Sequence, residues 1–405
     1  MVKSGDIGMK IGIFGGSFDP VHTEHIRVAQ AAIKSLGLDK LLIMPAHTPP
    51  HKAGKSLSPD HERLELCRLA FENTAGAEVS DYEMRQGGTS FTYLTCEHFR
   101  NAYPNAELFW LVGTDMLRDF PTWKYPERIL QSVTLAVCAR NEADGWIEKE
   151  RADFLRRFGK DFAVVAYNGA AVSSTKIRVL AGAGMRLTPF VPETVEAYIQ
   201  EKHMYEIVGA KESLALQKPS RAEHSLRVAL VAATRAGSVG VAEKKAIAAA
   251  LLHDCAKNLR LDDPLLRGFE IKDEWGEVPE SVLHQFTGAF VAQTALGVDD
   301  EEILDAIRFH TSGKENMTAL GKLIFLADMV EEERKYDCVD ILRELFWQND
   351  DTLPPENRLD ACLERALKET LLYLKKNGTI VYTLTEKAYA FYAKGDCYGK
   401  KRNQQ

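Results

Sequence analysis

Apolar and polar residues are arranged in two different ways along this chain, and the change falls near its middle. Up to about residue 119, short apolar runs alternate with stretches whose apolar residues recur at helical spacing. This alternation is typical of a doubly wound parallel sheet. The predicted strands of this part are residues 9–14, 41–45, 78–83 and 108–113. Beyond residue 205, Ala-rich amphipathic stretches predict helices to about residue 375.

The fold class expected from this pattern is α/β, a Rossmann-like parallel sheet, followed by an all-α domain. A chain of 405 residues is long enough for two separate cores. A largely polar stretch that carries Gly and Pro follows residue 205 and predicts a linker. The predicted boundaries are 1–207 for the α/β domain, 208–219 for the linker, 220–395 for the helical domain and 396–405 for a polar tail.

Composition narrows the class of protein. The chain is 45% hydrophobic and 27% charged, as in ordinary globular proteins, and its formal net charge of −7 argues against nonspecific nucleic-acid binding. It has no apolar run long enough to span a membrane and no signal-peptide core in its first residues. The seven cysteines never form a C-x-x-C pair, which indicates a reducing environment. We therefore expect a cytoplasmic protein with no membrane or nucleic-acid partner, and leave the oligomeric state open, a homo-oligomer included.

The first candidate site lies in residues 11–25, which predict a strand, a glycine turn and a helix. Gly15 and Gly16 would let the backbone approach a phosphate, and the start of the helix offers free N–H donors to an anion. His22 and His25 are three residues apart at the start of this helix and can project to one side. On these residues alone, a tight turn with two surface histidines explains the pattern equally well.

A second segment, Val172 to Arg178, places hydroxyls, a lysine and an arginine at another helix start. A Walker phosphate loop is excluded, because no Gly-Lys-Ser/Thr follows the glycine pair. Together the two segments resemble the HxGH-type nucleotidylyltransferase superfamily. The chain departs from the HxGH pattern once, with Glu24 at the usual glycine position.

The first half as a whole is similar to the bacterial nicotinate-nucleotide adenylyltransferases, from about Lys10 to Tyr205. The matching segments are Gly15 to His25, Pro49 to Lys52, Ser90 to Thr92, Gly113 to Asp115, Trp123-Lys124, Ser173 to Arg178 and a last helix from Val191. The resemblance implies transfer of AMP from ATP, with Mg²⁺, to nicotinate mononucleotide, giving nicotinate adenine dinucleotide and pyrophosphate. Another HxGH adenylyltransferase, acting on pantetheine phosphate, is the alternative, and nicotinate against nicotinamide mononucleotide stays open.

The resemblance also implies three groups of site residues. His22 and His25 would be catalytic and contact the triphosphate of ATP. The residues that would bind ATP and its phosphates are Gly15, Gly16, Ser17, Phe18, Lys52, Ser174, Thr175 and Arg178. The residues that would bind the nicotinate ring and the nucleotide sugar are Thr92, Trp123 and Asp115. Taken singly, Trp123 could be a packed aromatic, Lys52 a solvated surface lysine and Asp115 a helix N-cap.

The helical half carries histidines and aspartates within or beside apolar stretches. They are His224, His253, Asp254, His284, His310 and Asp328. An unpaired ionisable group is costly in such surroundings, and metal ligation is one way to satisfy several of them at once. Imidazole with carboxylate suits Fe, Mn, Zn or Co rather than Ca. Any one of these histidines, taken alone, is more often a hydrogen-bonded core residue.

The order H…HD…H…H…D resembles the HD-domain metallophosphohydrolases, and most of all the bacterial symmetrical diadenosine tetraphosphatases. The resemblance implies that His224, His253, Asp254 and Asp328 hold one metal. It implies that His284 and His310 hold a second metal, with the catalytic Asp254 as a bridge. The expected metals are two iron ions, with Mn, Co or Zn as alternatives.

The implied reaction of this half is attack of a metal-activated water on diadenosine tetraphosphate, giving two ADP. Lys257, Arg308 and Lys322 are candidate phosphate contacts, although charged residues usually lie on solvated faces. Two alternatives stay open for this half. It could hydrolyse another nucleotide, or it could be a metal-bound module that senses nucleotides without turnover.

Overall fold

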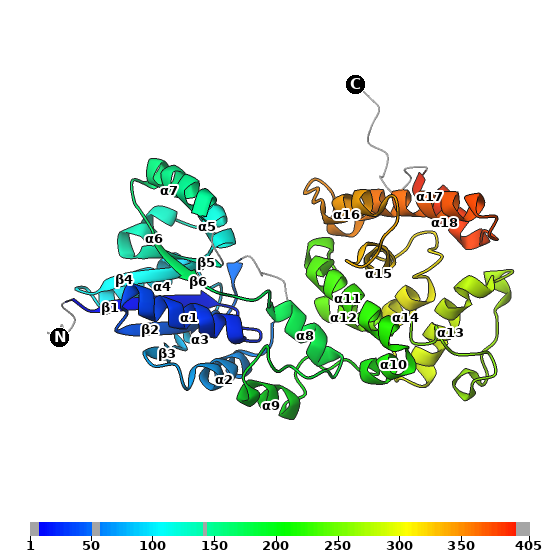
Figure 1. Ribbon diagram of the computed structural model, residues 1–405, viewed down its shortest axis with the longest axis horizontal. Coiled ribbons are helices and arrows are strands. Elements are labelled where there is room, and N and C mark those ends of the chain that lie inside the picture. Colours follow the sequence, from blue (N-terminus) through cyan, green and yellow to red (C-terminus); the bar gives the residue numbers. More distant parts are fainter. Residues whose placement is uncertain (1–7, 51–56, 141–143, 394–405) are drawn as a thin grey trace, which may run out of the picture. The chain divides into compact units, whose positions relative to one another are not determined.

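The computed structural model describes residues 8–50, 57–140 and 144–393 (Figure 1). Internal contacts divide the chain into two compact units. The first comprises Met1–Ile177 and Leu187–Lys202, and the second comprises Arg178–Arg186 and His203–Gln405. The first unit is α/β and the second is helical in the described residues, so the predicted fold class is confirmed.

The first unit is built on a parallel sheet of six strands in the order β3-β2-β1-β4-β5-β6. The strands are β1 (Lys10–Gly16), β2 (Lys40–Pro45), β3 (Ala77–Val79), β4 (Glu107–Gly113), β5 (Thr134–Arg140) and β6 (Ala163–Tyr167). β1 pairs with both β2 and β4, so the strand order reverses beside it. Ligands of such sheets bind outside the carboxyl ends of the strands at this switch point.

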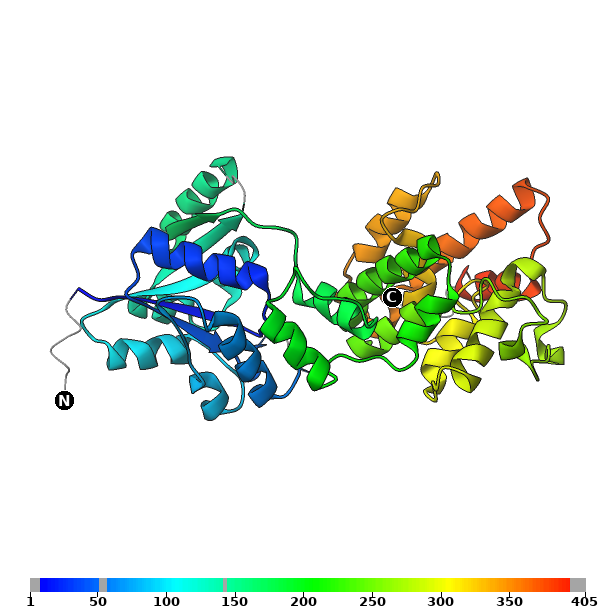
Figure 2. The same ribbon diagram turned by 60° about the horizontal axis from the view of Figure 1, so that its bottom comes forward.

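Helices cover both sides of this sheet (Figure 2), as a parallel sheet requires. The helices of this unit are α1 (Thr23–Leu36), α2 (Asp60–Phe71), α3 (Tyr82–Gln86), α4 (Thr92–Ala102), α5 (Thr114–Asp119), α6 (Pro126–Ser132), α7 (Asp144–Phe158) and α9 (Glu193–Glu201). The helix α8 (Ser174–Gly182) begins in this unit, and its residues from Arg178 onward belong to the second unit. Apolar residues of α4 to α7 pack with one face of the sheet in a single core. The apolar run of β2 is buried almost throughout, which explains its strong strand signal.

The second unit is a packed set of helices. They are α10 (Ala210–Leu216), α11 (Pro219–Ala236), α12 (Glu243–Leu252), α13 (Glu280–Thr294), α14 (Glu301–Arg308), α15 (Ala319–Val330), α16 (Val339–Trp347), α17 (Asp360–Lys376) and α18 (Thr383–Ala393). The apolar run from Ala246 to Leu252 is buried on all sides. A helix that is apolar all round belongs at the centre of a core, and α12 packs against α10, α11, α14 and α15.

The segment 208–219, which the sequence assigns to a linker, contains α10. Ala210 is fully buried, and the buried Ser213 donates from Oγ to the carbonyl of Leu251, at 2.8 Å. This helix is therefore packed onto α12. The domain boundaries stay a prediction, and the predicted tail 396–405 lies outside the described residues. Within the described ranges, no helix combines the length and apolar character needed to cross a membrane.

Candidate functional site

Gly15 and Gly16, at the end of β1, lie at the switch point of the sheet. The sequence predicts that the strand ends before these glycines, but β1 continues through them, with Gly15 paired to Met44 and Gly16 to Pro45. Gly15 is required there, because a Cβ on it would lie 2.8 Å from Cζ2 of Trp110. The chain turns only afterwards, where Phe18 adopts a left-handed conformation at φ 48°.

His22 and His25 lie together at the start of α1. His22 is the N-cap, and the two imidazole rings stack with their centroids 3.7 Å apart. The backbone N–H of His22 donates to Nδ1 of His25 at 3.1 Å, so the proton of His25 is on Nε2. Burial, and then the charge of Arg140, lower the pKa of His22 to about 4. His22 is therefore a neutral imidazole at pH 7, which can donate a hydrogen bond but carries no positive charge.

The second predicted phosphate segment packs against the first. Ser174 begins α8 and donates from Oγ to the carbonyl of Pro20 at 2.9 Å, across 154 positions of sequence. The carboxylate of Glu24 accepts a hydrogen bond from the backbone of Ala170 at 2.9 Å. Two hydrogen bonds thus join the start of α1 to the chain around the start of α8, and Thr175 lies in the first turn of α8.

Arg178, also predicted to bind phosphate, has a different partner. It donates from Nε and Nη2 to both carboxylate oxygens of Glu243, at 2.6 and 2.9 Å. Both residues belong to the second compact unit. The bidentate geometry that suits phosphate is used here on a carboxylate.

The predicted nicotinate and sugar residues lie at several helix starts and turns. Thr92 begins α4, and the exposed Asp115 lies in the first turn of α5, directly after β4. Trp123 follows the short 3₁₀ helix Phe120–Thr122, and its half-buried ring packs against Phe120 with centroids 5.4 Å apart. This packing is also what the structural alternative for Trp123 predicts. Lys52 lies outside the described residues.

Arg63 of α2 is a site-supporting residue that the sequence analysis did not identify. Its side chain is fully buried and donates to the carbonyls of Ser17 at 2.9 Å, Ala46 at 2.6 Å and Ser58 at 2.9 Å. It thereby ties together the segments that follow β1 and β2. The sequence feature that could have indicated a buried arginine is its position on the apolar face of α2, three residues before the buried Leu66.

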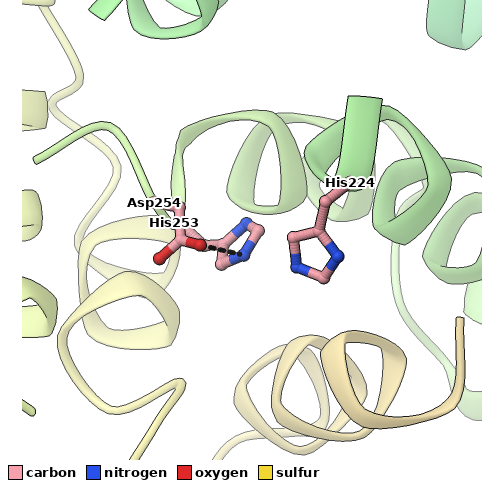
Figure 3. A group of neighbouring side chains, drawn as sticks. All are labelled: His224, His253 and Asp254. Carbon is pink, nitrogen blue, oxygen red and sulfur yellow. Dashed lines mark ion pairs between the residues drawn. The ribbon is translucent and has the colours of Figure 1, made fainter. Parts of the chain in front are cut away.

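In the second unit, the histidines and aspartates of the HD-like pattern come from five helices and the turns that follow them. Figure 3 shows that His224 from α11 points toward His253 and Asp254, which directly follow α12. The atoms that could hold a metal form two groups, His224 with His253 and Asp254, and Asp254 with His284 and His310. Within each group the donor atoms lie within 4.8 Å of one another. The cluster therefore has two candidate metal positions that share Asp254.

The orientation of two rings is set by backbone carbonyls. Nδ1 of His253 donates to the carbonyl of Ala250 at 2.6 Å, and Nδ1 of His310 donates to that of Ile307 at 2.8 Å. A carbonyl can only accept, so each Nε2 carries a lone pair when the ring is neutral. Nε2 of His253 and Oδ1 of Asp254 are buried and, among the described residues, have no hydrogen-bond partner. Buried nitrogen and oxygen atoms that lack a hydrogen bond and face one another in this way fit the ligands of a divalent transition metal.

The ring of His224 is oriented by a carboxylate. Its Nδ1 lies 3.1 Å from Oε1 of Glu331, while its Nε2 lies 2.8 Å from Oδ1 of Asp328. Glu331 is buried and also accepts from Nε of Arg227 at 2.7 Å. The carboxylate of Glu331 thus orients the ring from the Nδ1 side, as is usual around metal-binding histidines, while Nε2 faces Asp328, the other predicted ligand of the same metal. Glu331 was not among the predicted site residues.

The charges of the cluster are strongly coupled. Burial alone would raise the pKa of Asp254, but His253 and His310 hold it well below its usual range. Burial and the neighbouring His310 and Lys257 lower the pKa of His284 to about 2. The carboxylate of Asp254 is therefore ionised and His284 is neutral, the protonation states that metal ligation needs.

The three predicted phosphate contacts of this unit lie in different surroundings. Lys257 Nζ is 3.1 Å from both ring nitrogens of His284, so this lysine is at the cluster. Arg308 instead pairs with Glu301 on its own helix at 2.8 Å. Lys322 is buried and donates to Asp360 at 2.5 Å and to the carbonyl of Glu356 at 3.0 Å. The contacts of Arg308 and Lys322 are with these partners rather than with the cluster.

Two further cations contact the cluster. Arg221 Nη1 lies 3.1 Å from Oδ2 of Asp254, and Arg334 pairs with Asp328. With Lys257, they place positive charge beside the candidate metal positions, as binding of a polyphosphate requires.

Comparison with known proteins gives a match in each half of the chain. The cytidylyltransferase-like family matches residues 13–180, and the HD domain family matches residues 221–333. A probable nicotinate-nucleotide adenylyltransferase/Ap4A hydrolase of Mycoplasma genitalium is 29% identical over 333 residues, which are 81% of this chain and 89% of the relative. A probable nicotinate-nucleotide adenylyltransferase of Clostridium botulinum is 35% identical over 197 residues, 48% of this chain and 98% of the relative.

Among solved structures, similarity is found to a protein of Clostridium acetobutylicum, described as a predicted HD superfamily hydrolase involved in NAD metabolism. It is 28% identical, covers 46% of this chain and 96% of its own, and has a TM-score of 0.39.

Proposed function

Since the first half of the chain belongs to the nicotinate-nucleotide adenylyltransferase family and the second half carries an HD domain, we propose a bifunctional nucleotide enzyme. The first activity transfers AMP from ATP to nicotinate mononucleotide, giving nicotinate adenine dinucleotide and pyrophosphate. The second hydrolyses diadenosine tetraphosphate symmetrically to two ADP. Both are nucleotide reactions at phosphorus, one a group transfer and the other a hydrolysis.

The observation that best supports the first activity is the hydrogen bond between Ser174 and Pro20. It joins the start of α8 to the segment that runs from the end of β1 to the stacked His22 and His25. Imidazole donors at a helix start suit the triphosphate of ATP.

The proposed transfer needs no general base. The phosphate of nicotinate mononucleotide is already ionised at pH 7, and one of its oxygens bonds to the α-phosphorus of ATP while the bond to the β-phosphate oxygen breaks. Pyrophosphate leaves with Mg²⁺. The role of the chain is to position both nucleotides and to donate hydrogen bonds to the charge that moves onto the leaving oxygen. A neutral His22 can make such a donation without altering its own protonation state.

The second activity is supported by the shared Asp254 and its surrounding cations. An HD domain implies a divalent metal, and such a metal, when bound, activates water for attack on phosphorus. We propose two iron ions, held by His224, His253, Asp254 and Asp328 on one side and by His284, His310 and Asp254 on the other. Arg221 and Lys257 would bind the bridging phosphates of the substrate.

One pair of variants of the full chain tests both activities, each acting as the control for the other. His22→Ala should abolish formation of nicotinate adenine dinucleotide and leave hydrolysis of diadenosine tetraphosphate intact. Asp254→Ala should do the reverse and should also lower the metal content. The first assay includes pantetheine phosphate, and activity on it with none on nicotinate mononucleotide would overturn the first assignment. Bound metal with no release of ADP would overturn the second in favour of another nucleotide or a sensor role.

A further inference from the structure

We propose that Glu24 is a positioning residue, which holds the loop before α8 in the conformation that binds ATP. The inference rests on the proposed adenylyl transfer and concerns a residue with no assigned role in it. Glu24 lies between the two stacked histidines, in the first turn of α1.

The side chain of Glu24 points into the protein, although it is a carboxylate at a helix start. Glu24 is 4% exposed, and each of its two carboxylate oxygens has a hydrogen-bond or ion-pair partner. Oε2 accepts from the backbone N–H of Ala170 at 2.9 Å, and Oε1 pairs with Arg27. A buried carboxylate is costly unless it is paired, so these partners restrict where the side chain and the loop can lie.

Gly169 makes this contact sterically possible. A Cβ at this position would lie 2.4 Å from Oε2 of Glu24 and 2.6 Å from the ring of Tyr167. A residue with a side chain would therefore displace the carboxylate or the loop. Gly169 thus allows the Glu24 carboxylate to approach the loop closely enough to accept the hydrogen bond from Ala170.

The loop is anchored again where α8 begins. The carbonyl of Ala170 accepts from the backbone N–H of Val172 at 3.0 Å, and Ser174 donates to Pro20. Glu24 fixes one side of this short turn and Pro20 the other, and both belong to the segment that carries the histidines. Because Ser174 and Thr175 are proposed ATP-binding residues, loss of the Glu24 anchor should impair ATP binding rather than binding of the second nucleotide.

The test compares four variants of the full chain in the adenylyl transfer assay, with ATP and nicotinate mononucleotide varied separately. Glu24→Ala removes the acceptor, and Glu24→Asp keeps the charge but shortens the reach. Each should lower kcat/KM for ATP by roughly tenfold, the size expected for a hydrogen bond to a charged group. The KM for nicotinate mononucleotide should not change. Glu24→Gln keeps an acceptor oxygen and should recover most of the loss.

Arg27→Ala is the matched control, because it removes the other partner of Glu24 and leaves the hydrogen bond from Ala170. It should retain wild-type kcat/KM for ATP. Should Glu24→Ala fail to fold, Glu24→Asp carries the test. Wild-type kinetics in both Glu24→Ala and Glu24→Asp would overturn the inference and leave the proposed adenylyl transfer unaffected. The same holds for an equal loss of kcat/KM for the two substrates together with a lowered Tm. An inactive wild-type chain would overturn the proposed adenylyl transfer together with it.

Discussion

Asp254 is the residue that both candidate metal groups share. Its substitution therefore tests whether the cluster binds two metals through a common ligand or is a set of neighbouring histidines that binds none. Asp254→Asn keeps the size of the side chain and removes its charge. If Asp254 bridges two metals, both should be lost together. His224→Gln and His284→Gln each alter one group and should each weaken one metal position.

The size of the effect follows from the number of ligands. Binding of a divalent metal by four protein ligands is worth about 12 kcal/mol, or roughly 3 kcal/mol per ligand. Loss of the shared ligand should therefore weaken each position by about 100-fold. The replacement amide also loses the ion pair with Arg221, in which the atoms are 3.1 Å apart. The expected loss is thus largest for Asp254→Asn and falls on both positions.

The measurement is metal content per chain by elemental mass spectrometry, after purification without chelator and dialysis against buffered metal. We expect two metals in the wild-type chain, fewer in either histidine variant and fewest in Asp254→Asn. Adenylyl transfer should be equal in all of them, which shows that the chain is folded. Two retained metals in Asp254→Asn, or loss of both in His284→Gln, would refute the shared-ligand arrangement.

Three further predictions concern residues outside the shared ligand. Glu331→Gln should weaken metal binding by about 10- to 100-fold in a competition titration, because His224 loses the carboxylate that orients it. Lys322→Met should lower the free energy of unfolding in urea by about 3–5 kcal/mol by leaving Asp360 buried and unpaired, and adding Asp360→Leu should restore most of it. The pKa of His22 is lowered from 6.5 to about 4, so between these values the unfolded chain binds more protons than the folded one and stability falls as the pH falls. Between pH 7 and pH 4 the wild-type chain should lose about 3 kcal/mol more than His22→Asn in urea unfolding at each pH.

The fold class follows from apolar periodicity, but parts of the sheet do not. Residues 41–45 are all buried in β2, and such an apolar run is recognisable without any tertiary information. β5 and β6 were not among the predicted strands, although the buried centre of β5 carries the same signature. The end of β1 was misplaced, because a glycine that usually breaks a strand is here required by the nearby indole of Trp110.

Some residues of the candidate sites can likewise be recognised from the local sequence, whereas others depend on tertiary contacts. His253 and Asp254 are adjacent in sequence, and their position after an apolar helix indicates a buried polar pair. Glu331 contacts His224 across 107 positions, and no local pattern identifies such a partner. Arg63 binds carbonyl oxygens, which every residue possesses, so its role depends wholly on where the fold places the backbone.

The two candidate sites differ in their electrostatics, in a chain whose net charge is −7. In the first candidate site, burial lowers the pKa of His22, so that its neutral imidazole can donate a hydrogen bond without carrying a charge. In the second unit, Arg221 and Lys257 surround a carboxylate that is itself held ionised. The cations beside Asp254 suit the charge of the proposed tetraphosphate substrate, and a bound divalent metal among them would suit the activation of water.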